Sequence, residues 1–269
     1  VEITNVSKLL RLFLLTICTL IVSVSNSYAN TEAKEKSASE VWNSLLPKQF
    51  KERAEFAFIK NNPEFPNVLI YGDSISIGYT QTVRAELEGK ANIYRLYLNG
   101  GDSKSFIRKM TKMHQTMQDK KLLDGWRFNW DVIHFNVGLH DLKYLKDKKL
   151  NKREGKQVNS VEQYAKNLRK IIQYLKKLAP TAKLIFATTT PVPEGEAGRV
   201  AGDANKYNAV ALKVMQDFPE IVINDLYILT KPNHHLWWTK SGNVHYNELG
   251  RKAQGKKVAD KILSTLKAK

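Results

Sequence analysis

Two side chains far apart in the sequence have the types needed for nucleophilic catalysis. Ser74 follows an apolar run, residues 68 to 71, that is typical of a buried strand, and an amphipathic helical stretch begins directly after it. A serine at a helix N-terminus lies beside free backbone N–H groups and the positive end of the helix dipole, which stabilise a developing oxyanion. His245, near the other end of the chain, could remove the serine proton. Taken alone, Gly-Asp-Ser also fits a helix N-cap in a tight turn.

Two further segments place glycine and polar side chains directly after apolar runs. They are residues 99 to 103, Asn-Gly-Gly-Asp-Ser, and residues 136 to 141, Asn-Val-Gly-Leu-His-Asp. Glycine lets the backbone approach a ligand closely and offer it an N–H group. Because the carboxyl ends of parallel strands collect the reactive groups of open sheets, we expect both segments to lie near Ser74.

The segments between these sites predict strands and helices in alternation. Short continuous runs rich in Val and Ile suit strands buried on both faces. Helical periodicity is clearest in residues 160 to 178, where Ser160 and Gln163 are spaced as a capping box and Pro180 ends the helix. Such alternation predicts a parallel α/β sheet covered by helices. The apolar runs are 68–71, 93–98, 132–137, 184–187 and 221–223.

In their joint order and spacing, these motifs resemble the SGNH hydrolase family, also called the GDSL esterase and lipase family. Residues 72–74 are similar to its nucleophile block, Gly101 to its oxyanion glycine, residues 138–141 to its third block and His245 to its catalytic base. The resemblance covers residues 66–269. It implies a flavodoxin-like three-layer α/β/α sandwich with a parallel five-stranded sheet, and a serine esterase that acts through an acyl-enzyme without a metal or other cofactor.

The resemblance also implies the roles of the site residues. Ser74 is the nucleophile, His245 its base, and the oxyanion hole consists of the N–H groups of Ser74 and Gly101 with a side chain from the third block. The family has Asn where this chain has His140. A neutral imidazole still donates one N–H, so His140 can keep the role, with Asn136 as the reserve donor.

A second departure concerns the acid that orients the catalytic histidine. The family carries Asp three residues before its histidine, where this chain has Gly242. Losing that acid in a serine protease costs on the order of 10⁴ in rate. Asn243 or a backbone carbonyl could hold the ring of His245 instead. Asp225, at the end of the fifth strand, is the other candidate, although a strand-end hydrogen-bonding role suits it better.

Aromatic and histidine side chains precede His245 on the same loop. Trp237 and Trp238 are expected to form a pocket for the acyl or leaving group or to stack on sugars, with one of them fixing the loop to the core. His234 and His235 could suggest a metal site with His245. No carboxylate stands at a matching spacing, so a metal is disfavoured.

The charge of the chain favours anionic partners. Its 269 residues contain 43 Lys and Arg against 26 Asp and Glu, for a net charge of +17. Seven of the basic residues fall between Lys143 and Lys156. A basic run is more often a solvated loop than a binding site, but its position after the third block offers a reason for an anionic substrate.

The N-terminus carries the features of a secretory signal peptide. Lys8 and Arg11 precede an apolar run too short to span a bilayer, and Ser-Tyr-Ala at 27–29 supplies a cleavage site after Ala29. The single cysteine, Cys18, lies within it, which excludes thiol chemistry in the mature chain. We therefore predict a signal peptide in residues 1–29, a partly helical leader in 30–62 that packs on the domain, and a hydrolase domain in 63–269.

The predicted function is a secreted esterase, periplasmic or extracellular, without a stable membrane anchor. It would remove O-acetyl or other short acyl groups from a carbohydrate, with an anionic polysaccharide favoured by the charge. A lysophospholipase or thioesterase is the alternative among enzymes. A catalytically weak member that binds glycans is the alternative outside them, and nucleic acid is disfavoured because no recognition motif is present.

Overall fold

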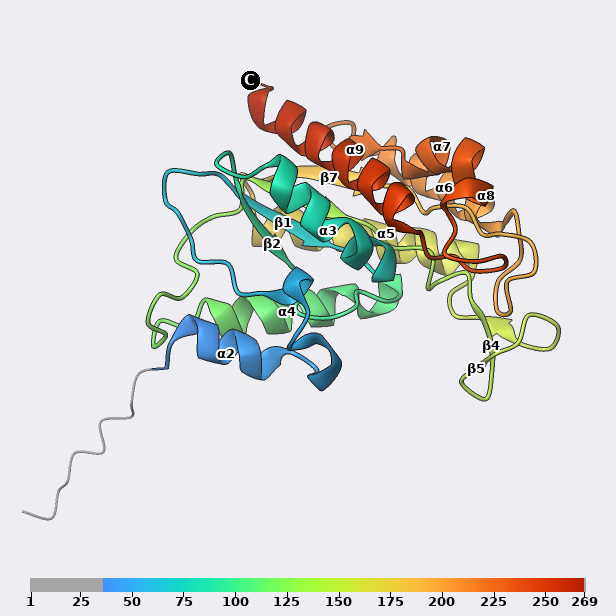
Figure 1. Cartoon of the computed structure of the whole chain (residues 1–269), viewed down its shortest axis with the longest axis horizontal. Coiled ribbons are helices and arrows are strands. Elements are labelled where there is room, and N and C mark those ends of the chain that lie inside the picture. Colours follow the sequence, from blue (N-terminus) through green and yellow to red (C-terminus); the bar gives the residue numbers. More distant parts are fainter. Residues whose placement is uncertain (1–35, 269) are drawn as a thin grey trace, which may run out of the picture. The chain divides into compact units, whose positions relative to one another are not determined.

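The computed structural model describes residues 36–268, and the predicted signal peptide lies outside them. Five parallel strands form the main sheet: β1 (Asn67–Tyr71), β2 (Asn92–Arg95), β3 (Val132–Phe135), β7 (Lys183–Ala187) and β8 (Val222–Asn224). Their order in the sheet is β2-β1-β3-β7-β8 (Figure 1). This is the order of a flavodoxin-like fold, and it confirms the predicted α/β/α sandwich with a five-stranded parallel sheet.

The five apolar runs form the strands of the main sheet. Apolar residues point to both sides of these strands because helices cover both faces of this sheet. Residues 68–71 of β1 are fully buried, and they lie in parallel register with β2 on one side and β3 on the other. The second and third apolar runs extend beyond their strands, since β2 ends at Arg95 and β3 at Phe135. The remaining residues of both runs form loops at the carboxyl edge of the sheet.

Helices α3 and α9 pack together on one face, and α4, α5 and α6 cover the other (Figure 1). In α5, Ser160 accepts the N–H of Gln163 at 3.2 Å, but the Gln163 side chain donates to Asn167, so only half of the predicted capping box forms. No helix within residues 36–268 is long and apolar enough to cross a bilayer. The helices on the two faces are α3 (Ser74–Glu86), α4 (Phe106–Met117), α5 (Val161–Leu178), α6 (Asp203–Met215) and α9 (Glu248–Lys267).

The segment before β1 packs on the sheet domain. Its helix α2 (Ala38–Leu45) buries Trp42, whose indole N–H donates to the carbonyl of Phe56 at 2.7 Å. Phe56 in turn lies against the guanidinium of Arg95, 4.5 Å from its ring centroid. Four buried residues of this segment therefore belong to the core, namely Ala38, Trp42, Leu46 and Phe56. Two short 3₁₀ helices complete this segment, η1 (Lys48–Phe50) and η2 (Ala54–Phe56).

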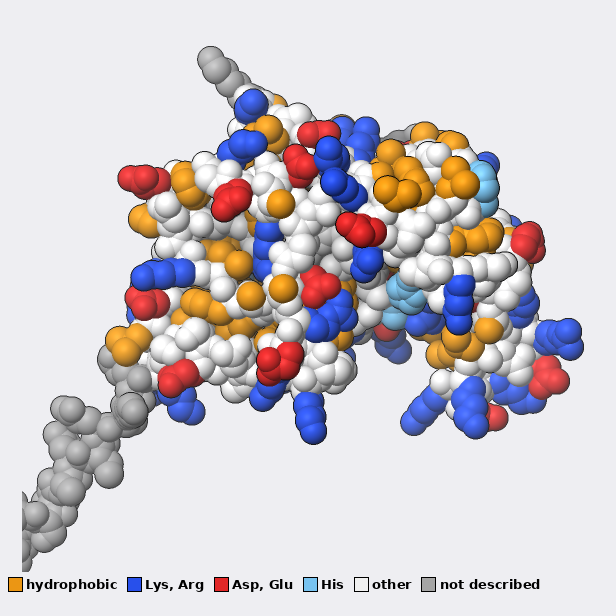
Figure 2. Space-filling model, in the orientation of Figure 1, with side chains coloured by type: hydrophobic (Ala, Val, Ile, Leu, Met, Phe, Trp, Pro, Cys, Tyr) orange, Lys and Arg blue, Asp and Glu red, His pale blue; other side chains and the backbone are white. Residues whose placement is uncertain are grey.

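A small basic lobe projects from the carboxyl edge of the main sheet. It is an antiparallel sheet of β4 (Tyr144–Lys146), β5 (Lys149–Leu150) and β6 (Lys156–Gln157). Figure 2 shows Lys and Arg side chains gathered on this projection, with the surface hollowed between it and the rest of the molecule. Shorter elements surround the same edge: η3 (Ser103–Ser105), α7 (Leu226–Thr230), η4 (Lys231–Asn233) and α8 (His234–Trp237).

Replacing Trp42 by Ala should lower the free energy of unfolding by about 3–5 kcal/mol, because the change leaves a cavity in a buried site. It also removes the donor to the Phe56 carbonyl. Urea denaturation followed by circular dichroism measures the loss. Asn43→Ala, on the exposed side of the same helix, is the control and should change stability by less than about 0.5 kcal/mol. Equal stabilities of the two variants would contradict a packed role for this segment.

Candidate active site

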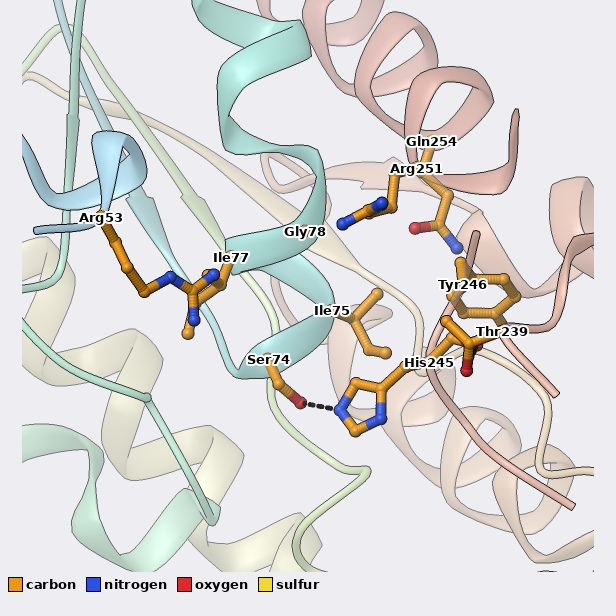
Figure 3. Close-up of a pocket in the computed structure, with 10 residues that line it drawn as sticks. All are labelled: Arg53, Ser74, Ile75, Ile77, Gly78, Thr239, His245, Tyr246, Arg251 and Gln254. Carbon is orange, nitrogen blue, oxygen red and sulfur yellow. Dashed lines mark hydrogen bonds between the residues drawn. The ribbon is translucent and has the colours of Figure 1, made fainter. Parts of the chain in front are cut away.

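Ser74 is the first residue of α3, directly after the turn that ends β1. Asp73 caps the helix by accepting the N–H of Ile75 at 2.9 Å, which fixes the turn. No carbonyl within the helix accepts from the N–H of Ser74, because the first N–H groups of a helix have no intrahelical partner. The Ser74 Oγ lies 2.9 Å from Nε2 of His245 (Figure 3). The structure thus brings the two predicted catalytic residues into direct contact.

The protonation pattern of His245 follows from its second contact. Its Nδ1 lies 2.8 Å from the side-chain oxygen of Asn243, which also accepts the backbone N–H of His245. An amide oxygen only accepts, so Nδ1 carries the proton and Nε2 is left to accept from the Ser74 hydroxyl. Of the two candidate orienting residues, the structure therefore brings Asn243 to the imidazole. Asp225 lies elsewhere, capping α7 and accepting from Thr188 at 2.9 Å.

Burial favours the uncharged form of His245. Partial burial lowers the pKa of His245 below its usual 6.5, and the charges of Arg199 and Lys143 lower it further. The buried carboxylate of Asp73 acts in the opposite direction. Asp73 is fully buried, one of its oxygens has no hydrogen-bond partner among the described residues, and burial raises its own pKa. Its charge supplies part of the field that a triad acid would supply.

His140 is held as a neutral donor by an adjacent lysine. Its Nδ1 lies 2.9 Å from Nζ of Lys143. An ammonium group can only donate, so Nδ1 accepts and the proton of the neutral ring resides on Nε2. Burial lowers the pKa of His140 to about 3, with the charges of Lys143 and Arg199 adding to the effect. The ring is therefore neutral near pH 7 and retains one N–H. Burial lowers the pKa of Lys143 to about 8, so Lys143 holds that proton at Nε2 below this pH, while it is an ammonium.

Gly101 and Asn136 have other partners in this structure. The backbone of Gly101 has φ +67, a conformation that glycine adopts readily, and its N–H donates to the Asn99 side chain at 2.9 Å. Binding an oxyanion there requires that Asn99 give up this hydrogen bond. The Asn136 amide donates to the backbone carbonyls of Ala187 and Thr188. Both of its N–H groups are thus directed into the fold, which favours His140 as the side-chain donor.

Asp141 links the loop that carries Gly101 to the loop that carries His140. Its carboxylate accepts the backbone N–H of Ser103 at about 3 Å and the side chain of Asn159 at 2.7 Å. The hydroxyl of Ser103 donates to the same carboxylate. Because Asp141 follows His140 directly and Ser103 stands two residues after Gly101, this buried cluster fixes the separation of the two loops.

A pocket of about 220 Å³ opens beside the Ser74–His245 pair. It is lined by the first turns of α3 and by residues of the segment 239–254 (Figure 3). Neither of the predicted aromatic residues lines it. Trp238 packs edge-on against His234, with ring centroids 4.8 Å apart, and the Trp237 side chain lies against Gly250 of α9. Both tryptophans thus support the loop, and their role in binding substrate stays a prediction.

Several contributors to the site carry no sequence signal of their own. Lys143 stands in a basic run, and only the fold joins it to His140. Arg199 and Glu196 form a buried ion pair at 2.6 Å, and Arg199 donates to the carbonyl of Leu139 beside His140. In the sequence, only the i,i+3 spacing of Glu196 and Arg199 indicates that they could pair. Among residues 36–268, no group of three or more His, Cys, Asp or Glu side chains could hold a metal ion.

Residues 70–253 match the model of the GDSL-like lipase/acylhydrolase family, and the chain belongs to that family. A search of curated proteins found no match. A lipase/acylhydrolase from Enterococcus faecalis is 15% identical, with a TM-score of 0.56, and the alignment covers 76% of this chain and 98% of that one. The acetyl xylan esterase AlAXEase is 21% identical, with a TM-score of 0.53, covering 74% and 98%.

A third solved structure is the catalytic domain of the peptidoglycan O-acetyltransferase OatA from Streptococcus pneumoniae. It is 16% identical, with a TM-score of 0.50, and the alignment covers 74% of this chain and 94% of that one. At these identities the solved structures establish the shared fold. The family itself is that of acylhydrolases, as the motifs around Ser74 and His245 had predicted.

The pH dependence of ester hydrolysis should report the state of His245. Since only the neutral ring accepts the serine proton, kcat/KM should fall toward acid with a midpoint below 6.5, the usual pKa of histidine. Asn243→Asp places a carboxylate beside Nδ1, favours the imidazolium and should move this midpoint to higher pH.

Asn243→Ala serves as the comparison. It should lower kcat/KM by as much as about 10⁴, because the ring loses its tautomer control, without moving the midpoint upward. Rates are measured on a neutral small ester across pH 4–9 at constant ionic strength. An unshifted midpoint in the Asp variant would contradict the contact between residues 243 and 245 in solution.

Proposed function

We propose that the protein is an exported serine carboxylic ester hydrolase that removes O-acetyl or other short acyl groups from a carbohydrate. The 2.9 Å contact between Ser74 Oγ and an unprotonated His245 Nε2 carries this proposal. It is the arrangement in which a serine loses its proton as it attacks an ester carbonyl. Membership of an acylhydrolase family supports the reaction type.

Acylation begins when Ser74 Oγ attacks the ester carbonyl and its proton passes to Nε2 of His245. Asn243 stabilises the resulting imidazolium through the N–H at Nδ1. The tetrahedral oxyanion is bound by the N–H of Ser74, by Nε2–H of His140 and, after it leaves Asn99, by the N–H of Gly101. The imidazolium then returns its proton to the alkoxy oxygen, the ester C–O bond breaks, and the alcohol departs.

Deacylation repeats the steps with water in place of the alcohol. His245 removes a proton from water, the hydroxide adds to the acyl carbon, and the same donors bind the new oxyanion. Collapse of that intermediate returns the proton to Ser74 Oγ and releases the carboxylic acid. Each half-reaction requires His245 neutral at its start, which the lowered pKa provides.

The nature of the acyl group and of the alcohol is supported by the comparisons and by the pocket. Two of the matched structures are named for acetyl groups on carbohydrates, an acetyl xylan esterase and a peptidoglycan O-acetyltransferase. Several polar residues line the pocket of about 220 Å³, which suits a sugar as the alcohol of the ester. A lysophospholipase or thioesterase remains the alternative, since the family also includes lipases. Comparing p-nitrophenyl acetate with p-nitrophenyl octanoate separates the two.

Export follows from the predicted signal peptide in residues 1–29, which lies outside the described residues. An exported location gives the enzyme access to cell-surface or extracellular polysaccharides. The apparent mass of the secreted protein and its N-terminal sequence test this part of the proposal. A mature N-terminus at Asn30 supports cleavage after Ala29.

Ser74→Ala and His245→Ala should each abolish most ester turnover while leaving the fold intact, because nucleophile and base act as one unit. The double variant should lose little beyond either single variant. Turnover of p-nitrophenyl acetate and circular dichroism provide the two measurements. Near wild-type activity in a folded Ser74→Ala protein would refute the proposal.

His140→Ala should lower kcat by about 10²–10³ with a smaller effect on KM, as expected for a lost oxyanion donor, and His140→Asn should recover part of it. Lys143→Met should also lower kcat, because it frees the tautomer of His140. The same change in the His140→Asn protein should have little effect, since an amide needs no tautomer control. An equal loss in both backgrounds would make Lys143 a structural residue only.

The basic lobe gives a prediction about the polymer. Lys146 pairs with Glu154 and Lys152 donates to the carbonyl of Glu196, whereas Lys148 and Lys149 are exposed at the tip. Turnover of an acetylated acidic polysaccharide should fall as salt rises from 0.1 M to 1 M, because the Debye length shrinks from about 10 Å to about 3 Å. A neutral small ester should be indifferent to salt.

Exchanging both lysines at the lobe tip, Lys148→Gln with Lys149→Gln, should reproduce the effect of high salt on the polymer. Equal salt responses for both substrates would show that the lobe is a solvated loop with no role in binding the polymer.

A further inference from the structure

The pocket beside Ser74 lies on the side of the site where the alcohol leaves. In acyl transfer by serine, the histidine that takes the nucleophile's proton later gives it to the leaving alkoxide, so it adjoins the alcohol and not the carbonyl oxygen. His245, Thr239 and Tyr246 form one wall of the pocket. Of the three proposed oxyanion donors, Ser74 lines the pocket, whereas His140 and Gly101 come from other loops and do not. The pocket thus extends from Ser74 toward His245, the side on which the alcohol leaves in the proposed mechanism.

A buried amide in the wall of this pocket has no partner. The Gln254 side chain is 0% exposed, and neither its nitrogen nor its oxygen makes a hydrogen bond within residues 36–268. Leaving a buried amide unpaired is costly, and the great majority of such groups in folded proteins are satisfied. Figure 3 shows the Gln254 side chain between Arg251 and Tyr246 at the pocket. Once the amide turns into the pocket that it lines, a sugar hydroxyl could donate to its oxygen and accept from its nitrogen.

The pocket also holds a cation without an ion-pair partner. Arg251 is exposed at the start of α9, near the positive end of the helix dipole, where a cation does not stabilise the helix. Its guanidinium forms no hydrogen bond or ion pair in the part of the chain that the structure describes. The other arginine of the pocket, Arg53, is already paired with Glu55 at 2.8 Å. Arg251 is thus the cation available to a ligand.

The contact between α9 and α3 fixes where Arg251 lies. A Cβ atom added to Gly78 would come within 3.0 Å of its Cδ, so the glycine makes room for the arginine stem. The guanidinium is thereby held on the opposite side of the first turns of α3 from Arg53 (Figure 3). Guanidinium groups bind carboxylates with two parallel hydrogen bonds, which gives both orientation and selectivity.

We infer that this pocket is a subsite for an acidic sugar, in which Arg251 binds the carboxylate and Gln254 a ring hydroxyl of the acylated alcohol. The inference deepens the proposed function and rests on it, because it identifies the leaving alcohol of that reaction as a uronic acid residue. The net charge of +17 and the basic lobe across the hollow favour an anionic polymer as the source of that sugar.

The test compares two esters that differ only at C6, mono-O-acetyl methyl glucuronide and mono-O-acetyl methyl glucoside. The wild-type protein should prefer the glucuronide in kcat/KM. Arg251→Gln should lower the ratio of the two kcat/KM values by about 10- to 100-fold, the usual effect of losing one charged hydrogen-bonding contact. Arg251→Lys should recover part of the ratio, because lysine keeps the positive charge but lacks the two parallel N–H donors of the guanidinium.

Lys252→Gln is the matched control, since it removes the same charge from the next exposed position of α9 and does not line the pocket. It should leave both rates unchanged. A ratio that is unaltered in Arg251→Gln, or lowered equally in Lys252→Gln, would overturn the subsite while leaving the esterase intact.

A binding measurement separates failure of the subsite from failure of the proposed function. Calorimetry with methyl glucuronide and the Ser74→Ala protein does not depend on turnover. Loss of binding on adding Arg251→Gln, with binding retained on adding Lys252→Gln, supports the subsite even if no ester is hydrolysed. Absence of glucuronide binding to Ser74→Ala, or binding equal to that of methyl glucoside, would overturn it.

Discussion

The proposed mechanism depends on keeping two imidazole rings uncharged, one as an acceptor and the other as a donor. In it, His245 accepts from Ser74 through a bare Nε2, and His140 donates to the oxyanion from a protonated Nε2. Desolvation lowers the pKa of both rings. The charges of Lys143 and Arg199 lower the pKa of His140 further, whereas at His245 the carboxylates of Asp73 and Glu196 oppose them. Opposite tautomers then follow from opposite partners, since the amide oxygen of Asn243 accepts from Nδ1 of one ring and the Lys143 ammonium donates to Nδ1 of the other.

The sheet order makes this arrangement attainable. Because β1 lies between β2 and β3, the loops that follow these three strands meet at one edge, where the chain connections diverge to opposite faces of the sheet. The close approach is visible in the backbone, where Gly100 donates to the carbonyl of Gly72 at 2.9 Å. A Cβ atom on Gly100 would lie 2.7 Å from that carbonyl oxygen, so a larger residue would separate the two loops. Asp141 adds the corresponding link to the third loop.

The sequence predicted those parts of the structure that are encoded by neighbouring residues, as an apolar run or a short motif. Continuous Val and Ile runs predicted the strands, and the motifs around Ser74 and His245 predicted the contact that forms. Asn243 and Asp225 could not be ranked, because their distance from the imidazole depends on how the loop before α9 turns. Trp237 and Trp238 contact Gly250 and His234 and do not line the pocket beside Ser74, and their role in binding substrate stays a prediction. Arg251 and Gln254 belong to no motif of the sequence, and only the packing of α9 against α3 gives them a shared pocket.

The dispersal of the site along the chain has a consequence for its biosynthesis. Ser74 is synthesised well before Asn243, His245 and α9. While the ribosome still holds residues 243–267, Ser74 lacks both the imidazole and the amide that orients it. In the proposed mechanism, the serine therefore gains its base only after α9 has docked against α3.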